Sequence, residues 1–224
     1  MNSSLIWIIM IAVMLLSFII QQRLQRKFAK YSQVPAAYTG AEIAELMLRQ
    51  NGISDVRVIS TKGQLTDHYN PTNKTVNLSE GVYGSRSVAA IAVAAHETGH
   101  AIQHATGYTP VKLRSALVPF VSFASNIVQW VLLAGVIFVT AFPALLWLGI
   151  ALFATTTLFS LITLPVEVNA SKRAVEWLET QGITDFETRP MVEDALQWAA
   201  YTYVIAAIGS LATLFYYIGI ARNR

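Results

Sequence analysis

The sequence predicts a mainly α-helical integral membrane protein, with four transmembrane helices and a small α+β unit. The unit is formed by the residues between spans one and two and after span three. Hydrophobic residues make up 54% of the 224 residues and charged residues only 13%, against about 25% charged in a soluble domain. Charges are absent from three long segments, residues 1–22, 115–166 and 195–221. Such a chain has too few charged residues to form the surface of a soluble globular protein. It is also too hydrophobic for a disordered protein.

A helix that crosses the ~30 Å hydrocarbon core of a bilayer needs about 20 apolar residues. Residues 5–20 are slightly short, but polar flanking residues can lie at the interface. No small-residue cleavage site follows them, so we interpret them as a retained anchor and not as a signal peptide. Pro143 near the centre of the second uncharged segment predicts a helical hairpin over 117–139 and 144–164. The last span is predicted over 200–220.

Lysine and arginine residues are distributed unequally on the two sides of the predicted spans. The hairpin tip has none, and only Arg222 and Arg224 lie on the same side as the tip. The basic residues that flank the spans on the other side are Arg23, Arg26, Lys27, Lys30, Lys112, Arg114, Lys172 and Arg173. The positive-inside rule therefore predicts a multi-pass protein of the cell membrane with its polar regions in the cytoplasm and both termini outside.

Charge and cysteine content exclude several classes of function. The net charge of +3 comes from residues beside the spans and forms no basic stripe, so no nucleic-acid partner is expected. The expected partner at these residues is the lipid bilayer. The chain contains no cysteine, which excludes disulfide scaffolds, thiolate zinc sites and a cysteine nucleophile.

The polar region after the first span is predicted to fold as a small α+β unit. Thr39 and Glu42 fit a capping box that begins a helix over residues 40–50. A further helix is predicted over 87–105. Between the two helices, runs of β-branched or alternating residues separated by turn residues predict a small antiparallel sheet with strands at 56–60, 64–69 and 75–78.

The helix predicted over 87–105 contains the sequence His96-Glu97-Thr98-Gly99-His100. Histidines at positions i and i+4 lie on one helix face, so two imidazoles can bind one metal ion. In this HExxH pattern, which is typical of metalloproteases, the glutamate is the general base. The alternative is an amphipathic helix with incidental surface histidines. Because the surrounding residues are small and apolar, the charged side chains need a partner there, and we predict a site for one zinc ion.

A catalytic zinc site needs a third protein ligand and an open position for water. His104 lies about 12 Å along the helix axis from His96, at about 1.5 Å per residue. We therefore expect it to support the site or to face substrate. Glu167 is the better candidate, because Pro165 suits the first turn of a new helix and would place Glu167 near a helix N-terminus at the membrane boundary. The alternative is a carboxylate that only stabilises that N-terminus.

Four segments closely resemble the YugP-like family of membrane-bound neutral zinc metallopeptidases: DHYNP from Asp67, VAAHETGHAIQH from Val93, PVEVNASKR from Pro165 and AAYTY from Ala199. The resemblance covers nearly the whole chain and implies that His96, His100 and Glu167 are the zinc ligands. It also implies that Glu97 is the catalytic base. The arrangement is similar to that of gluzincin membrane proteases related to HtpX, which implies a zincin-like catalytic unit. Asn169 stands where we expect aspartate in many relatives, so no carboxylate is available there to orient a ligand.

The expected chemistry is hydrolysis by a zinc-activated water, in which Glu97 takes the proton of the water and passes it to the leaving amine. A further donor should stabilise the oxyanion, and the candidates are His68, Tyr69, Asn169 and Arg173. A structural role in the small sheet is an equal alternative for His68 and Tyr69. A contact with phospholipid is an equal alternative for Arg173.

The predicted function is therefore that of a membrane-embedded zinc endopeptidase whose substrates are peptides or proteins at or near the membrane. The alternatives are a zinc-stabilised membrane scaffold without turnover and a zinc hydrolase of a lipid amide or ester. Glu97 argues against the scaffold, because a structural site needs no base. The predicted divisions are an anchor at 1–22, a cytoplasmic catalytic region at 23–115, a transmembrane hairpin at 116–165, a cytoplasmic helical segment with the third ligand at 166–198, and a C-terminal helix and tail at 199–224.

Overall fold

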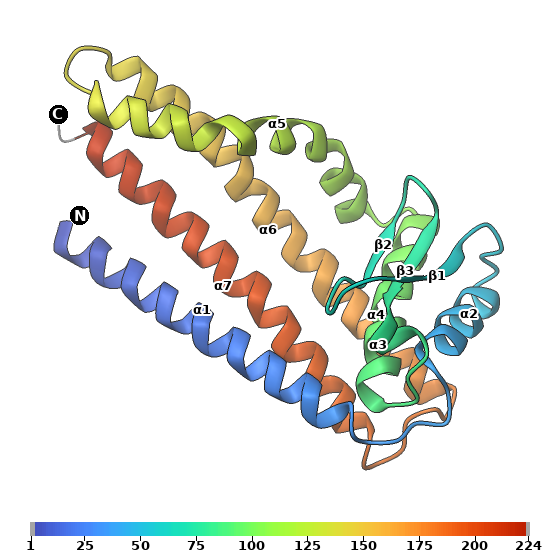
Figure 1. Cartoon of the computed structure of the whole chain (residues 1–224). Coiled ribbons are helices and arrows are strands. Elements are labelled where there is room, and N and C mark those ends of the chain that lie inside the picture. Colours follow the sequence, from blue (N-terminus) through green and yellow to red (C-terminus); the bar gives the residue numbers. More distant parts are fainter. Residues whose placement is uncertain (1–2, 223–224) are drawn as a thin grey trace. The chain divides into compact units, whose positions relative to one another are not determined.

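The computed structural model describes residues 3–222 of the chain. The outermost residues of the predicted anchor and tail, Met1, Asn2, Asn223 and Arg224, lie outside the described residues. The described residues are mainly helical (Figure 1). In chain order the elements are α1 Ser3–Tyr31, α2 Gly40–Gln50, β1 Arg57–Thr61, β2 His68–Asn70, β3 Thr75–Ser79, α3 Glu80–Tyr83, α4 Val88–Ala105, α5 Thr109–Ile137, α6 Pro143–Thr180 and α7 Arg189–Arg222.

These elements form two compact units, and the long helices α1, α5, α6 and α7 contribute residues to both. The first, called here the helical unit, consists of Met1–Ile19, Lys112–Pro165 and Thr202–Arg224. The second, called the mixed unit, consists of Ile20–Val111 and Val166–Tyr201.

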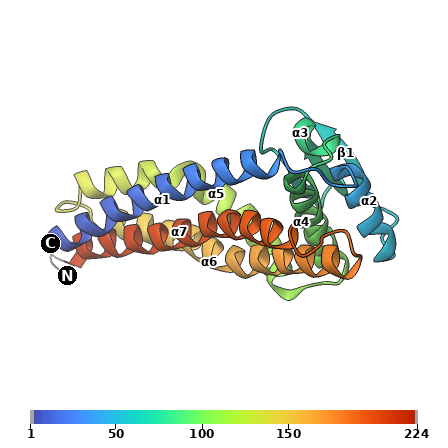
Figure 2. The same cartoon turned by 90° about the horizontal axis from the view of Figure 1, so that it is seen from below.

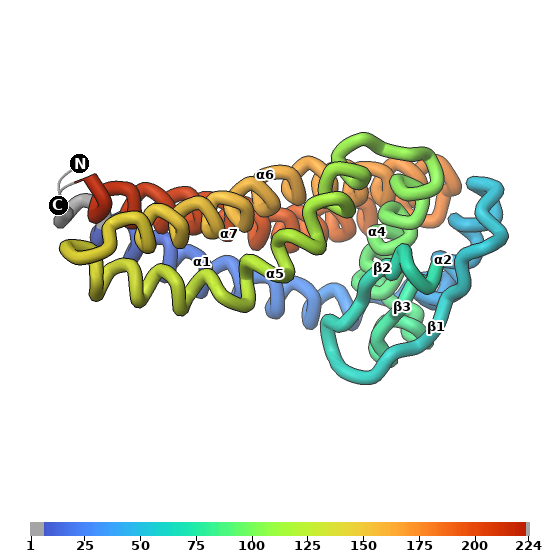
Figure 3. Tube along the Cα trace, turned by 90° about the horizontal axis from the view of Figure 1, so that it is seen from above, coloured from blue at the N-terminus to red at the C-terminus, as the bar shows by residue number. Residues whose placement is uncertain are grey.

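The helical unit confirms the prediction of four helices long and apolar enough to cross a membrane. The candidate spans lie in α1, α5, α6 and α7. Within this unit α1 and α7 run side by side (Figures 2 and 3), and the Trp7 and Tyr216 rings are in edge contact at 5.7 Å. Large apolar side chains of α5 are exposed, among them Phe120, Phe123 and Trp130. A patch of this kind is unusual on a protein surface that faces water and suits one that faces lipid.

The predicted hairpin between the second and third spans is also present, because α5 ends at Ile137 and α6 begins at Pro143. Its two helices approach closely at Gly135, where an added Cβ atom would lie 2.7 Å from the Cα atom of Leu146. Only a residue without a side chain permits this separation, which is a common way for membrane helices to pack. Farther along α6, Thr157 accepts a hydrogen bond from Ser210 of α7 at 3.2 Å.

The prediction that a new helix begins at Pro165 is wrong. Pro165 lies inside α6, which continues without a break to Thr180. A proline removes one backbone hydrogen bond from a helix interior, but the residues that follow, Val166 and Ala170, are completely buried and hold the helix in place. Glu167 is therefore a buried side chain in mid-helix. This position also excludes the alternative that it merely stabilises a helix N-terminus.

Helices α2 and α4 of the mixed unit begin and end within one residue of the predicted bounds, whereas the short helix α3 was not predicted. Thr39 Oγ1 accepts a hydrogen bond from the Glu42 N–H at 3.1 Å, and the Glu42 carboxylate accepts one from the Thr39 N–H at 2.7 Å. This capping box begins α2. The side chain of Ser87 caps α4 in a similar way, and the chain leaves α4 before Gly107, which has a φ of 66°. A positive φ is readily adopted only by glycine.

The sheet has three strands as predicted, but it is mixed and not antiparallel. Its strand order is β1-β3-β2, with β1 parallel to β3 and β2 antiparallel to β3. The parallel pair is formed by β1 and β3, which are not consecutive along the chain. Every residue of β3 is buried, whereas β1 and β2 are partly exposed. The strand with the greatest burial therefore takes the centre, and β1 and β2 are the two edges.

The core of the mixed unit gathers around α4, which packs against α2, the sheet and the part of α6 that begins at Val166. The closest approach is at Gly99 of α4, where an added Cβ atom would lie 2.9 Å from the carbonyl oxygen of Ala170 in α6. A side chain at this position would push the two helices apart.

This contact generates a stability prediction. We expect Gly99→Val to lower the free energy of unfolding by about 1–3 kcal/mol, the usual cost of overpacking a core. Thermal unfolding of the detergent-purified protein measures it. The matched control is Gly81→Val, because an added Cβ atom at Gly81 meets nothing within 4 Å. Equal melting temperatures for the two variants would contradict the close packing of α4 and α6.

Candidate metal centre

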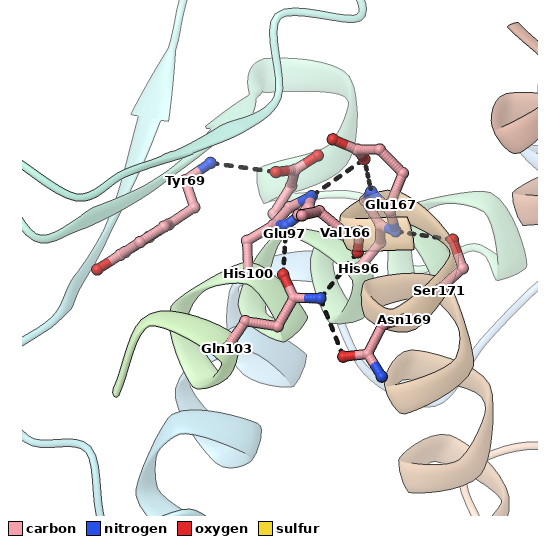
Figure 4. A network of polar contacts seen from close by, with 9 residues as sticks. All are labelled: Tyr69, His96, Glu97, His100, Gln103, Val166, Glu167, Asn169 and Ser171. Atoms are coloured by element: carbon pink, nitrogen blue, oxygen red, sulfur yellow. Dashed lines mark hydrogen bonds and ion pairs between the residues drawn. The ribbon is translucent and has the colours of Figure 1, made fainter. Parts of the chain in front are cut away.

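Two histidines of α4 and one glutamate of α6 converge in the mixed unit (Figure 4). The Nε2 atoms of His96 and His100 lie 3.3 Å and 3.2 Å from Oε2 of Glu167. The two imidazole rings are in edge contact, with centroids 4.8 Å apart. The helical spacing of four residues brings the histidines together, and the close approach of α4 and α6 at Gly99 brings Glu167 to them.

The Glu167 carboxylate is 2% exposed. An unpaired carboxylate at such a position costs several kcal/mol, and here both imidazoles lie beside it. Burial by itself lowers the pKa of the His100 imidazole, but the hydrogen bond with Glu167 and the negative charges of Glu97 and Glu167 outweigh burial and raise the pKa above its usual value. The site therefore has the electrostatic character of one that attracts a cation.

The residues present fit a zinc ion. One ligand atom from each of His96, His100 and Glu167 lies within 4.8 Å of the other two. Tetrahedral ligands about 2.1 Å from zinc are separated from one another by about 3.4 Å, which is close to the two nitrogen–oxygen distances observed here. Two imidazoles and a carboxylate are also a donor set of catalytic zinc sites.

Glu97 follows the first histidine but does not join this group of three residues. Its Oε2 atom accepts a hydrogen bond from the backbone N–H of Tyr69 in β2, at 3.1 Å (Figure 4). The edge strand thus holds the carboxylate beside the histidine pair. The Glu97 carboxylate therefore lies next to the candidate metal group without belonging to it.

The other ring nitrogens of the histidines have partners that sequence reasoning missed. Nδ1 of His100 lies 3.0 Å from Oε1 of Gln103, and Nδ1 of His96 lies 3.1 Å from Oγ of Ser171. Gln103 follows His100 by three residues and Ser171 follows Glu167 by four, so helical periodicity would have placed each on the correct face. Helical periodicity can identify these partners only once α4 and α6 are known to be neighbours.

The remaining sequence candidates do not belong to the group of His96, His100 and Glu167 among the described residues. His104 is exposed and does not join them; its Nδ1 atom lies 3.5 Å from the Tyr69 hydroxyl. His68 is also exposed, and its Nδ1 atom lies 2.8 Å from the carbonyl oxygen of Thr66. Asn169 and Arg173 are hydrogen-bonded to each other at 2.8 Å.

The strand that holds Glu97 is itself anchored by a partly buried acid. Asp67, directly before β2, accepts hydrogen bonds from the N–H of Ser79 at 2.7 Å and from its hydroxyl at 3.0 Å. Burial raises the pKa of Asp67, and the Glu97 charge raises it further, whereas the Ser79 hydrogen bonds lower it. The DHYNP segment therefore holds the Tyr69 N–H where it donates a hydrogen bond to the Glu97 carboxylate.

Comparison with known proteins gives two matches. A family model described as "Putative neutral zinc metallopeptidase" matches residues 6–222. A protein of Bacillus subtilis (strain 168) described as "Putative membrane protease YugP" is 44% identical over 215 residues, which cover 95% of each chain. No solved structure matches the chain.

The position of Glu167 beside the two histidines predicts that removal of its charge weakens zinc binding. We expect Glu167→Gln to bind far less than one zinc ion per chain, because the amide keeps the shape of the side chain but not the charge that offsets a dication. Metal analysis after gel filtration in detergent measures it. Glu176→Gln is the matched control, since Glu176 lies on the same helix and is exposed. Equal zinc content in the two variants would exclude Glu167 as a ligand.

Proposed function

The chain belongs to the family described as "Putative neutral zinc metallopeptidase", and from this premise we propose that it is a membrane-bound, zinc-dependent endopeptidase. The observation that carries the proposal is the convergence of His96, His100 and Glu167, with the Glu97 carboxylate held beside them. The name of the Bacillus subtilis relative, a membrane protease, supports the same activity.

The residues of the chain divide the work of peptide hydrolysis. His96, His100 and Glu167 would hold the zinc ion, which supplies Lewis acidity toward a carbonyl oxygen and toward water. Glu97 accepts the proton of the attacking water and passes it to the nitrogen of the leaving amine. The Tyr69 N–H keeps the Glu97 carboxylate oriented for both transfers. The partly open histidine side chains, each 12% exposed, leave access for the scissile bond.

Substrate binding is proposed to use the free edge of β2. This strand pairs with β3 on one side only, and its Tyr69 N–H donates to Glu97 and so marks the edge that faces the catalytic carboxylate. An extended peptide that adds to such an edge is held mainly by backbone hydrogen bonds. Recognition of this kind tolerates many side chains and suits an endopeptidase.

The proposed substrates are membrane proteins or segments presented near the bilayer surface. Glu167 follows the apolar residues 144–164 in the same helix, with Pro165 and Val166 between them. A ligand so close to an apolar span is expected near the membrane boundary. The lysine and arginine residues that flank the spans favour the cytoplasmic side for this site.

The general base is tested by Glu97→Gln. We expect this variant to keep its zinc and to lose activity on a denatured casein-type substrate by about 100- to 10,000-fold, the usual contribution of general acid–base catalysis. Glu45→Gln, an exposed glutamate of α2, is the control. Unchanged activity in Glu97→Gln would refute the assigned base, and zinc without cleavage in the wild type would favour the scaffold.

The substrate class is tested with the enzyme in lipid vesicles. We expect a cleavable segment tethered to the same vesicle by a transmembrane helix to be cut faster than the identical segment free in solution. The tether raises the local concentration of the segment near the site. Both rates are read by gel electrophoresis of the products. Equal rates would remove the preference for membrane substrates and leave the peptidase activity itself unaffected.

A further inference from the structure

A series of hydrogen bonds connects the candidate metal centre with the charged side chain of Arg173. Gln103 Oε1 lies 3.0 Å from His100 Nδ1, and Gln103 Nε2 donates to Asn169 Oδ1 at 3.0 Å. The same Nε2 atom donates to the carbonyl oxygen of Val166 at 2.8 Å. Asn169 Oδ1 also accepts a hydrogen bond from Arg173 Nε at 2.8 Å. Figure 4 shows the hydrogen bonds that connect His100, Gln103 and Asn169.

The Arg173 guanidinium and the Val166 carbonyl oxygen determine the direction of every hydrogen bond in this series. A guanidinium group can only donate, so Asn169 must turn its carbonyl oxygen toward Arg173. The backbone oxygen of Val166 can only accept. Gln103 must therefore present its NH₂ group to both oxygens, which leaves its own carbonyl oxygen facing His100. The orientation of both amide groups follows from this chemistry.

The same logic determines which nitrogen of His100 carries the proton. Because Gln103 Oε1 can only accept, Nδ1 of His100 must be the donor. When an imidazole binds a metal through Nε2, a proton on Nδ1 leaves the Nε2 lone pair free for the metal. Nε2 of His100 lies 3.2 Å from the Glu167 carboxylate, so a metal ion bound there would take the place of the proton that Nε2 and the carboxylate share.

Burial makes the hydrogen bonds of Gln103 difficult to replace. Gln103 is completely buried, and water cannot replace a hydrogen bond that it loses. Both ends of its amide group are used, and three of its partners, His100, Val166 and Asn169, come from the two helices that supply the ligands. The amide group therefore links the position of α6 to the ring orientation of His100.

Resting on the metal centre of the proposed function, we propose that Gln103, oriented by Asn169 and Arg173, is the positioning residue that fixes His100 in the tautomer able to bind zinc through Nε2. Partners of this kind behind a metal-bound histidine raise metal affinity by roughly 10- to 100-fold in other proteins. Asn169 and Arg173 thereby act on zinc affinity and are positioning residues, without contact with the reacting atoms.

The test measures the zinc dissociation constant by competition with a chromophoric chelator, and the melting temperature of the metal-free protein beside it. We expect Gln103→Leu to weaken zinc binding by roughly 10- to 100-fold, and Asn169→Leu to weaken it less, because Val166 still orients Gln103. Asn169→Asp keeps an acceptor oxygen for both donors and should restore wild-type affinity. Lys172→Leu, an exposed neighbour on α6, is the control and should bind zinc as the wild type does.

The outcomes separate this inference from the proposed function. Unchanged zinc affinity in Gln103→Leu, even with a lower melting temperature, would reduce Gln103 to a structural link between helices and overturn the inference. Equal losses in Asn169→Asp and Asn169→Leu would overturn the role of the acceptor oxygen. If Gln103→Leu does not fold, the two Asn169 variants decide the question. A wild type that binds no zinc would instead refute the proposed function.

Discussion

The burial of one carboxylate between two imidazoles is the interaction on which the candidate site depends. Glu167 is 2% exposed and lies 3.2–3.3 Å from the Nε2 atoms of both histidines. Without those partners, or a cation that replaces their protons, the carboxylate would be costly to bury. The arrangement requires that α4 and α6 approach closely, and Gly99 permits this approach. Helix packing and metal chemistry are therefore satisfied by the same contact.

The polar residues around the ligands form a second layer that limits their freedom. Tyr69 holds Glu97 from the strand side, whereas Gln103 and Ser171 hold the two histidine rings from α4 and α6. A site supported in this way is preorganised, and preorganisation is what makes a base or a metal ligand effective at its position.

The sequence predicted those features that depend on neighbouring residues in the chain. The capping box at Thr39, the spacing of His96 and His100 on one helix face, and the four apolar helices all follow local rules. The predictions were wrong or incomplete for features that depend on packing between residues far apart in the sequence. The order of the strands depends on which strand is most buried, and Pro165 lies inside a helix whose following residues, Val166 and Ala170, are buried. Gln103 and Ser171 were missed because their roles exist only once α4 and α6 are side by side.

The central claim is a zinc ion bound by two histidines and a glutamate. X-ray absorption at the zinc edge, on detergent-purified full-length protein, tests it most directly. We expect one zinc ion per chain, bound by two imidazole nitrogens and otherwise by oxygen atoms at about 2.0–2.2 Å. A protein that retains no zinc, or a zinc ion whose first shell contains no imidazole, would contradict it.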